Sequence, residues 1–137
     1  RQNFKGYLAG IIPITAWRIL NGIAPELHGE GLQSRDFIYV LDTVDALIKL
    51  HEVIPKGESI NISTDNQLSI SDLLQQICVG MNYHGEVLRK PGRKSDVLCH
   101  SASNEKIRKM INYSLTPFNQ GLKETLAWYQ QKITRPT

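Results

Sequence analysis

The sequence contains only two cysteines, Cys78 and Cys99, among its 137 residues. A single pair makes neither a disulfide framework nor a four-ligand zinc site. The histidines likewise follow no spacing of a common metal motif, so no metal site is predicted. Sparse use of cysteine is typical of a reducing compartment, and we expect a cytoplasmic protein.

Long apolar runs and strong charge are also missing. Every apolar run is far shorter than the roughly 18 residues that a membrane-spanning helix needs, and no secretory signal is recognisable. The net charge of +3 comes from 16 basic and 13 acidic residues, which is a mild excess. We therefore expect no membrane partner, and the position of the positive charges matters more than their number.

No glycine-rich phosphate loop of the GxGxxG or Walker type occurs in the sequence. Turns and helix caps explain the serines and threonines at positions 63–71, so no serine nucleophile is indicated. The first residue is Arg1 and not methionine. We expect these residues to be a piece of a longer polypeptide.

The pattern of apolar residues predicts a mixed α/β domain in which helices dominate. Asp42 is expected to cap a helix that carries Val44, Leu47 and Ile48 on one face, and Ser69 with Asp72 resembles a capping box. Helices are predicted at residues 11–21, 42–52, 70–77, 104–111 and 119–131, and strands at residues 26–28, 35–40, 59–63 and 85–89.

Two groups of cations invite a binding hypothesis. Arg35 stands just before the apolar segment 37–40, either as a strand-edge charge paired with Asp36 or as a cation held rigidly for a ligand. The second group is the stretch 89–94, RKPGRK, which is either a solvated basic loop or a site for a small phosphorylated ligand. It lacks interleaved aromatics that would stack bases, so nucleic acid is not an expected partner.

Several motifs, in order along essentially the whole chain, resemble the extended short-chain dehydrogenase/reductase family of nucleotide-sugar epimerases and dehydratases. Arg1-Gln2 and GYLAGIIPITAWRILNG are similar to the family's GPRQ segment and the helix that follows it. HGEGLQSRDFIYVLDTVDA resembles YGDGxQxRDFxYVxDxVxA, and GESINISTDNQLSISDLLQQI resembles GExxNIGxGxxxSixeLaxxi. Residues 93–97 are similar to RPGDV, and GLKETLAWYQQ is similar to the closing GLxxTixWY.

The resemblance implies substrate-binding roles for four residues. In the family the arginine of QxRDF contacts the diphosphate of a nucleotide-sugar, which implies Arg35, and the arginine of RPGD reaches the diphosphate or ribose, which implies Arg93. The neighbouring acid orders that loop or binds ribose, which implies Asp96, and Arg1 is a further candidate. Asp36 is interpreted as the neighbour that orients Arg35. Two separated arginines suit a pyrophosphate, because their planar forks neutralise it and set its register.

The resemblance also shows departures and absences. Ser95 stands where the family usually has glycine, and Ser103 stands where it often has aspartate. The family's amino-terminal GxxGxxG, which binds NAD(P), and its Tyr-x-x-x-Lys acid/base pair do not occur in these residues. We therefore expect NAD(P) to bind to the missing Rossmann half, and we expect these residues alone to bind no cofactor and to be catalytically incompetent.

The sequence thus predicts one carboxyl-terminal nucleotide-sugar-binding domain, residues 1–137, of an NAD-dependent UDP-hexose 4-epimerase. In such enzymes a hydride passes from the sugar C4 to NAD and returns on the opposite face. A nucleotide-sugar 4,6-dehydratase stays open because it shares the same motifs, and so does a non-catalytic module that binds a phosphorylated ligand. The expected partners are the nucleotide-sugar, the chain's own Rossmann domain and a second copy of the full-length protein.

The family's RDFxYVxDxV segment packs against the Rossmann domain. Without that domain, apolar residues such as Phe37, Val40 and Leu41 are expected to stay exposed. An exposed apolar patch favours association between molecules. We therefore predict that the 137-residue chain self-associates or exchanges segments with a second copy.

Overall fold

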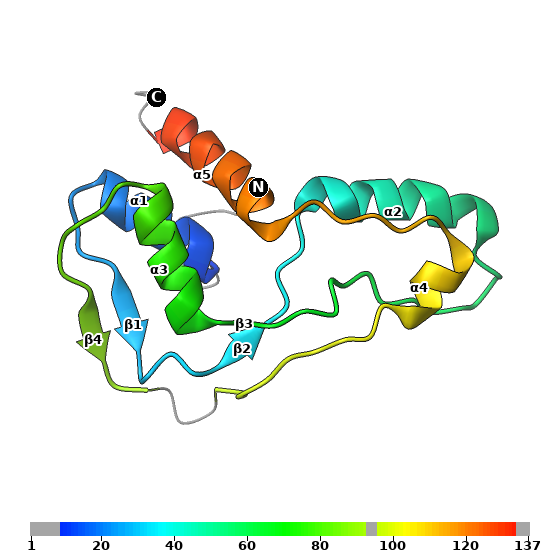
Figure 1. Ribbon diagram of the computed structural model, residues 1–137, viewed down its shortest axis with the longest axis horizontal. Coiled ribbons are helices and arrows are strands. Elements are labelled where there is room, and N and C mark those ends of the chain that lie inside the picture. Colours follow the sequence, from blue (N-terminus) through cyan, green and yellow to red (C-terminus); the bar gives the residue numbers. More distant parts are fainter. Residues whose placement is uncertain (1–8, 93–95, 134–137) are drawn as a thin grey trace.

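Helices and short strands alternate along the part of the chain that the computed structural model describes, residues 9–92 and 96–133 (Figure 1). The helices are α1 (Ile11–Leu20), α2 (Val40–Val53), α3 (Ile70–Gly80), α4 (Glu105–Met110) and α5 (Phe118–Ile133). The strands are β1 (Glu26–His28), β2 (Ser34–Arg35), β3 (Leu68–Ser69) and β4 (Leu88–Lys90). The predicted mixed α/β class with dominant helices is confirmed.

The strands form two separate pairs, one parallel and one antiparallel. β1 pairs with β4 in parallel, with Glu26 opposite Leu88. β2 pairs with β3 antiparallel over two residues only, with Ser34 opposite Ser69 and Arg35 opposite Leu68. Both pairs join segments that are far apart in the sequence, and in Figure 1 the β1–β4 pair lies at one edge of the molecule and the β2–β3 pair near its centre.

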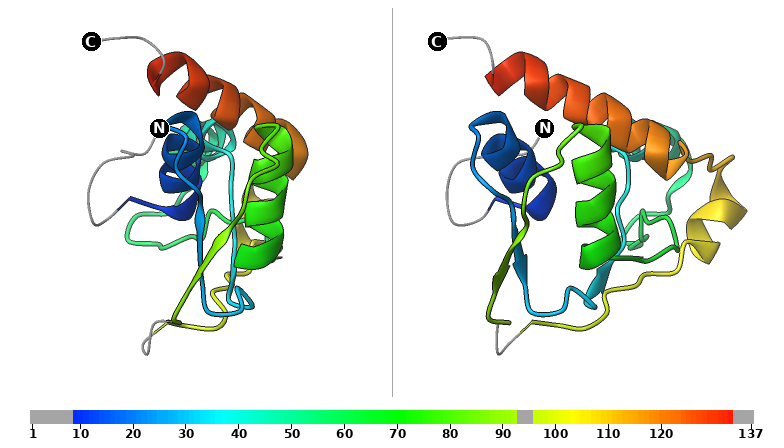
Figure 2. Two further views of the ribbon diagram at one scale, coloured as in Figure 1. Left: turned by 90° about the vertical axis from the view of Figure 1, so that its left-hand side faces the viewer. Right: turned by 60° about the vertical axis from the view of Figure 1, so that its left-hand side comes forward.

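Three helices, α1, α3 and α5, enclose the first hydrophobic core, and α5 lies across the other two (Figure 2). The capping box at the start of α3 is confirmed, because Ser69 Oγ accepts a hydrogen bond from the Asp72 amide at 3.0 Å. This bond satisfies a donor that the first helical turn cannot use internally. The buried side chains of this core are Ala16, Leu73, Ile77, Leu122, Leu126 and Tyr129.

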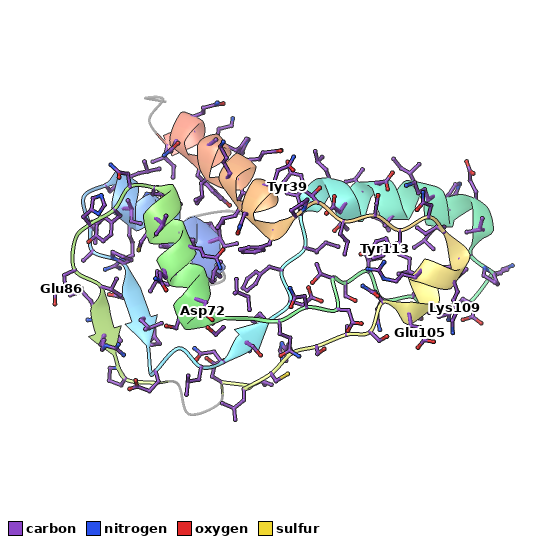
Figure 3. The ribbon with its side chains drawn as sticks, viewed as in Figure 1. Tyr39, Asp72, Glu86, Glu105, Lys109 and Tyr113 are labelled. Carbon is purple, nitrogen blue, oxygen red and sulfur yellow. The ribbon has the colours of Figure 1, made fainter. Side chains whose placement is uncertain are left out.

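A second core lies at the other end of the molecule, between α2 and α4 (Figure 1). It consists of the buried residues Ala46, Leu50, Ile107 and Tyr113. Tyr113 reaches inward from the segment after α4 (Figure 3), and its hydroxyl donates a hydrogen bond to the Ser63 carbonyl at 2.9 Å. A buried hydroxyl needs such a partner, so this bond lets a large aromatic side chain fill the small core.

The predicted cap of α2 is wrong. The helix begins at Val40 and its N-cap is Tyr39, so Asp42 lies within the first turn. The Asp42 carboxylate accepts hydrogen bonds from the Thr116 amide at 2.8 Å and from the Thr116 hydroxyl at 2.7 Å. Asp42 therefore ties the start of α2 to the segment that leads into α5.

The apolar face predicted for α2 exists, but it is not the buried face. Val44, Leu47 and Ile48 are 44%, 55% and 64% exposed, whereas Ala46 and Leu50 face the second core. Helical periodicity reports that one face is apolar and not what covers it. The structure supplies no cover for this face among the described residues.

Two of the predicted strands are also corrected. Of residues 35–40, only Arg35 belongs to a strand, because Ser34 and Arg35 are the residues that pair with β3. Residues 59–63 form no strand in the described part of the chain, although Ile60 and Ile62 pack on the second core as the alternating pattern predicted. A strand needs a ladder partner as well as a suitable pattern, and this segment has none here.

Candidate functional site

Arg35 lies at the centre of a junction between β2 and the segment after residue 95. Its Nη1 donates to the carbonyl oxygens of Ser34 and Val97, both at 2.7 Å, and its Nη2 donates to Asp96 Oδ1 at 2.7 Å. The Arg35 side chain is 24% exposed and that of Asp96 is 31% exposed. The structure therefore brings two of the predicted site residues together on the surface, although they are far apart in the sequence.

The same contacts leave part of the Arg35 guanidinium available. A guanidinium carries five N–H donors. The carbonyls of Ser34 and Val97 take both Nη1 hydrogens and Asp96 takes one on Nη2, so the Nε–H and the second Nη2–H have no partner among the described residues. Nε and Nη2 are the kind of donor pair that holds two oxygens of a phosphate.

Asp36 does not pair with Arg35, so the interpretation of Arg35 as a strand-edge charge neutralised by Asp36 is wrong. The Asp36 carboxylate instead accepts hydrogen bonds from the Thr64 amide at 2.9 Å, from the Thr64 hydroxyl and from the Asp65 amide at 3.1 Å. The backbone at these residues prevents a closer approach, because successive side chains of an extended segment point to opposite sides. The carboxylate that pairs with Arg35 is that of Asp96, from the other side of the junction.

Arg1 and Arg93, the other predicted site residues, lie outside the described residues. The described cations of the basic stretch 89–94 are Arg89 and Lys90, and each is paired with an acid. Arg89 lies 3.4 Å from Glu30 and Lys90 lies 3.9 Å from Glu26, which are nitrogen-to-oxygen distances across the junction of β1 and β4. These two cations therefore form surface ion pairs, which fits the alternative of a solvated basic loop.

Gln67 is a residue of this region that the sequence did not indicate. Its Oε1 accepts hydrogen bonds from Ser34 Oγ at 2.5 Å and from Cys99 Sγ at 2.9 Å. The backbone adds two further ties, from the Ser34 amide to the Leu98 carbonyl and from the His100 amide to the Ser34 carbonyl. A glutamine in a polar loop gives no sequence signal for such a role, because its partners lie more than 30 positions away.

A large open cavity of about 1460 Å³ adjoins this junction. Its walls come from the start of α1, the segment 37–41, the segment 64–68 and α5. Tyr39 borders it beside the first turns of α5 (Figure 3), and its hydroxyl donates to Glu124, which holds the pKa of that carboxyl below its usual range. Arg35 and Asp96 do not line the cavity, but Gln67 belongs to both regions.

Metal chemistry and membrane insertion find no support in the residues that the structure describes. Within residues 9–92 and 96–133, no three metal-ligating side chains are grouped closely enough to hold an ion. No helix in that same part of the chain is long and apolar enough to cross a membrane. The arrangement around Arg35 is suited to binding an anion, and the carboxylate within it, Asp96, is engaged by Arg35.

Comparisons with known proteins point to one family. The model of the NAD dependent epimerase/dehydratase family matches residues 1–63. The chain is 29% identical to the UDP-N-acetyl-alpha-D-glucosaminuronate decarboxylase of Bacillus cytotoxicus over 133 residues, which are 92% of this chain and 41% of the relative. It is 29% identical to the dTDP-D-glucose 4,6-dehydratase of Homo sapiens, over 78% of this chain and 33% of the relative.

The fold agrees with the sequence comparisons. A crystal structure of UDP-glucose 4-epimerase from Thermotoga maritima, with UDP-glucose, superposes with a TM-score of 0.90 at 28% identity. The match covers 97% of this chain and 43% of that one, so the chain spans well under half the length of its relatives. A decarboxylase is among them, an activity that the motifs of the sequence did not indicate. The chain is thus similar to part of several nucleotide-sugar epimerases and dehydratases, at 28–29% identity, and its first 63 residues match the NAD dependent epimerase/dehydratase family.

Proposed function

We propose that this chain is the carboxyl-terminal, substrate-binding part of an NAD-dependent nucleotide-sugar epimerase, with a UDP-hexose 4-epimerase as the favoured reaction of the whole enzyme. One observation carries the proposal. Arg35, at the position of the family's QxRDF arginine, is held by Ser34, Val97 and Asp96, and two of its N–H donors have no partner within residues 9–92 and 96–133. The similarity to an epimerase with UDP-glucose supports the choice of reaction.

In this proposal the chain binds and orients the ligand and does not perform the chemistry. Arg35 holds the diphosphate with its remaining donors, and Arg93, the arginine of the second motif, is proposed as a further contact. The second carboxylate oxygen of Asp96, which takes no bond from Arg35, can accept a hydrogen bond from a ribose hydroxyl. NAD, bound by the part of the enzyme outside these residues, would supply hydride transfer. The groups that act as acid and base would come from that same part.

The proposed partner is the NAD-binding part of the same enzyme. Two features support it, the uncovered apolar face of α2 and the unpaired segment 59–63. The segment 59–63 could add a strand to a sheet of the NAD-binding part, and α2 could cover that sheet with its apolar face. The homodimer of the full-length protein and its cytoplasmic location remain predictions.

Titration of the chain with UDP-glucose tests the binding role. We expect Arg35→Ala to raise the Kd at least about tenfold, because a hydrogen bond to a charged group contributes about 1.5–3 kcal/mol. Lys109→Ala is the matched control, since Lys109 is an exposed cation of α4 that pairs with Glu105 at the far end of the molecule (Figure 3). Arg93→Ala is expected to behave like Arg35→Ala.

Two outcomes of this titration would contradict the proposal. One is the absence of UDP-glucose binding, and the other is an equal loss for Arg35→Ala and Lys109→Ala, which would show only an effect of net charge. The rival 4,6-dehydratase is supported by the similarity to the human enzyme that acts on a dTDP-sugar. Tighter binding of dTDP-glucose than of UDP-glucose would favour that rival.

A further inference from the structure

Asp36 is the immediate neighbour of Arg35, and its carboxylate is engaged on the opposite side of the chain. It accepts from the Thr64 amide through both oxygens, at 2.9 and 3.2 Å, from the Thr64 hydroxyl and from the Asp65 amide at 3.1 Å. A carboxylate has about four lone-pair sites, so these contacts fill them. The hydrogen bonds of the Asp36 carboxylate therefore go to the turn at Thr64 and Asp65, and those of Arg35 go elsewhere.

The loop that Asp36 holds is the one that forms the strand partner of Arg35. Asp65 adopts a positive φ of 58°, and the chain then continues through Gln67 into β3. Because β2 and β3 share only two residue pairs, their ladder is too short to fix the direction of β2 by itself. Gln67 binds Ser34 on one side of Arg35, and Thr64 binds Asp36 on the other.

Arg35 is thus fixed from both sides along the chain, and the consequences reach its guanidinium. Its two Nη1 bonds, to the Ser34 and Val97 carbonyls, require the backbone of β2 to stay aligned with the segment after residue 95. Release of Asp36 would let β2 rotate. The remaining donors of Arg35 would then lose their common orientation, which a bidentate contact requires.

We propose that Asp36 is a positioning residue that orients Arg35 for anion binding by clamping the turn at Thr64 and Asp65. This inference rests on the proposed binding role of Arg35 and adds a residue that touches no ligand. It also gives Asp36 a second effect, because the clamped loop 64–67 forms one wall of the large cavity. The hydrogen bonds of Asp36 therefore fix the position of Arg35 relative to that wall of the cavity.

The test uses the 137-residue chain, with UDP as the probe and two independent readouts. The first is the Kd of UDP by calorimetry, for Asp36→Asn, Thr64→Val, Thr64→Ser and the double variant Asp36→Asn with Thr64→Val. The second is the NMR signal of the Arg35 Nε–H, assigned by its loss in Arg35→Lys, which reports the orientation of the guanidinium without any ligand.

We expect Asp36→Asn to raise the Kd about tenfold and to shift the Arg35 Nε–H signal and speed its exchange with water. Thr64→Val should give a smaller change in the same direction. Thr64→Ser should leave the Kd and the Nε–H signal as in the unchanged chain, because serine keeps the hydroxyl. The double variant should be no worse than Asp36→Asn alone, since both changes break the same contact.

The outcomes separate this inference from the proposed function. If Arg35→Lys leaves the Kd of UDP unchanged, the proposed anion site is wrong. If Arg35→Lys weakens binding while Asp36→Asn changes neither the Kd nor the Nε–H signal, the positioning role is wrong. If Asp36→Asn lowers the stability but leaves the Nε–H signal of the folded molecules unchanged, Asp36 has a structural role only and the positioning role is again wrong.

Discussion

The uncovered face of α2 gives the most direct prediction about this molecule. Five neighbouring apolar side chains on that helix are exposed by 44–64%, namely Val40, Leu41, Val44, Leu47 and Ile48. Full burial of one such side chain is worth about 1.5–3 kcal/mol, so covering the exposed half of each contributes about 5 kcal/mol per molecule. Two such faces packed together gain about 10 kcal/mol, against an association cost of about 4–15 kcal/mol.

This balance predicts reversible self-association of moderate to weak affinity. The perturbation is the double substitution Leu47→Glu with Ile48→Lys, which replaces two of the most exposed side chains of the face by charges of opposite sign. Sedimentation velocity over a concentration range from about 10 µM to about 1 mM covers the expected affinities. The unchanged chain should sediment faster as its concentration rises and should bind a hydrophobic dye, whereas the double variant should stay monomeric.

Val79→Lys is the matched control. Val79 is 75% exposed on α3 and has no such apolar surface next to it on the same helix, so its substitution should leave self-association unchanged. The unfolding temperature of the double variant should not fall, because neither changed side chain faces the core. A chain that remains a monomer near 1 mM with low dye binding would refute the reasoning, and so would unfolding of the double variant.

Three further predictions concern stability and reactivity. Gly31→Ala should lower the free energy of unfolding by about 2–5 kcal/mol, because the φ of Gly31 is +71° and the added Cβ would lie 2.8 Å from the Leu27 side chain. Gly22→Ala is the control: its φ is +68° with no neighbour within 4 Å, so it should lower that free energy by only about 1–2 kcal/mol in urea unfolding. Burial raises the pKa of Tyr113, so the unfolded chain loses this proton first and the free energy of unfolding should fall as the pH rises above about 10. Tyr113→Phe should make that fall smaller, as urea unfolding at several pH values would show. Burial also raises the pKa of Cys78, so iodoacetamide should label the exposed Cys99 faster, as peptide mass spectrometry would show, and equal rates would contradict the burial of Cys78.

The elements that were predicted correctly depend on local signals. The capping box of Ser69 and Asp72 and the helical spacing of Leu73 and Ile77 act within one or two turns, and the start of α3 follows them closely. Features that depend on distant partners were predicted poorly. Residues 59–63 have the alternating pattern of a strand, but a strand also requires a neighbour, which no local pattern can supply.

The site shows the same division. The resemblance of the QxRDF and RPGD motifs already placed Arg35 and Asp96 in one hypothesis, and the structure adds the bond between them. The engagement of Asp36 with Thr64 had no signal in the sequence, because acidic residues beside arginines are commonly interpreted as their partners. The direction in which a side chain leaves an extended segment depends on the register of that segment, and pairing with β3 determines this register.

The sequence by itself determined which segments can form helices, which faces of them are apolar and which family the motifs resemble, since all of these follow from the order of the residues. Only the tertiary structure decided that the apolar face of α2 points to solvent, that Asp42 binds Thr116 and that Arg35 binds Asp96. The physical reason is that burial and hydrogen bonding depend on groups brought close by the fold, and those groups lie tens of residues apart in this chain.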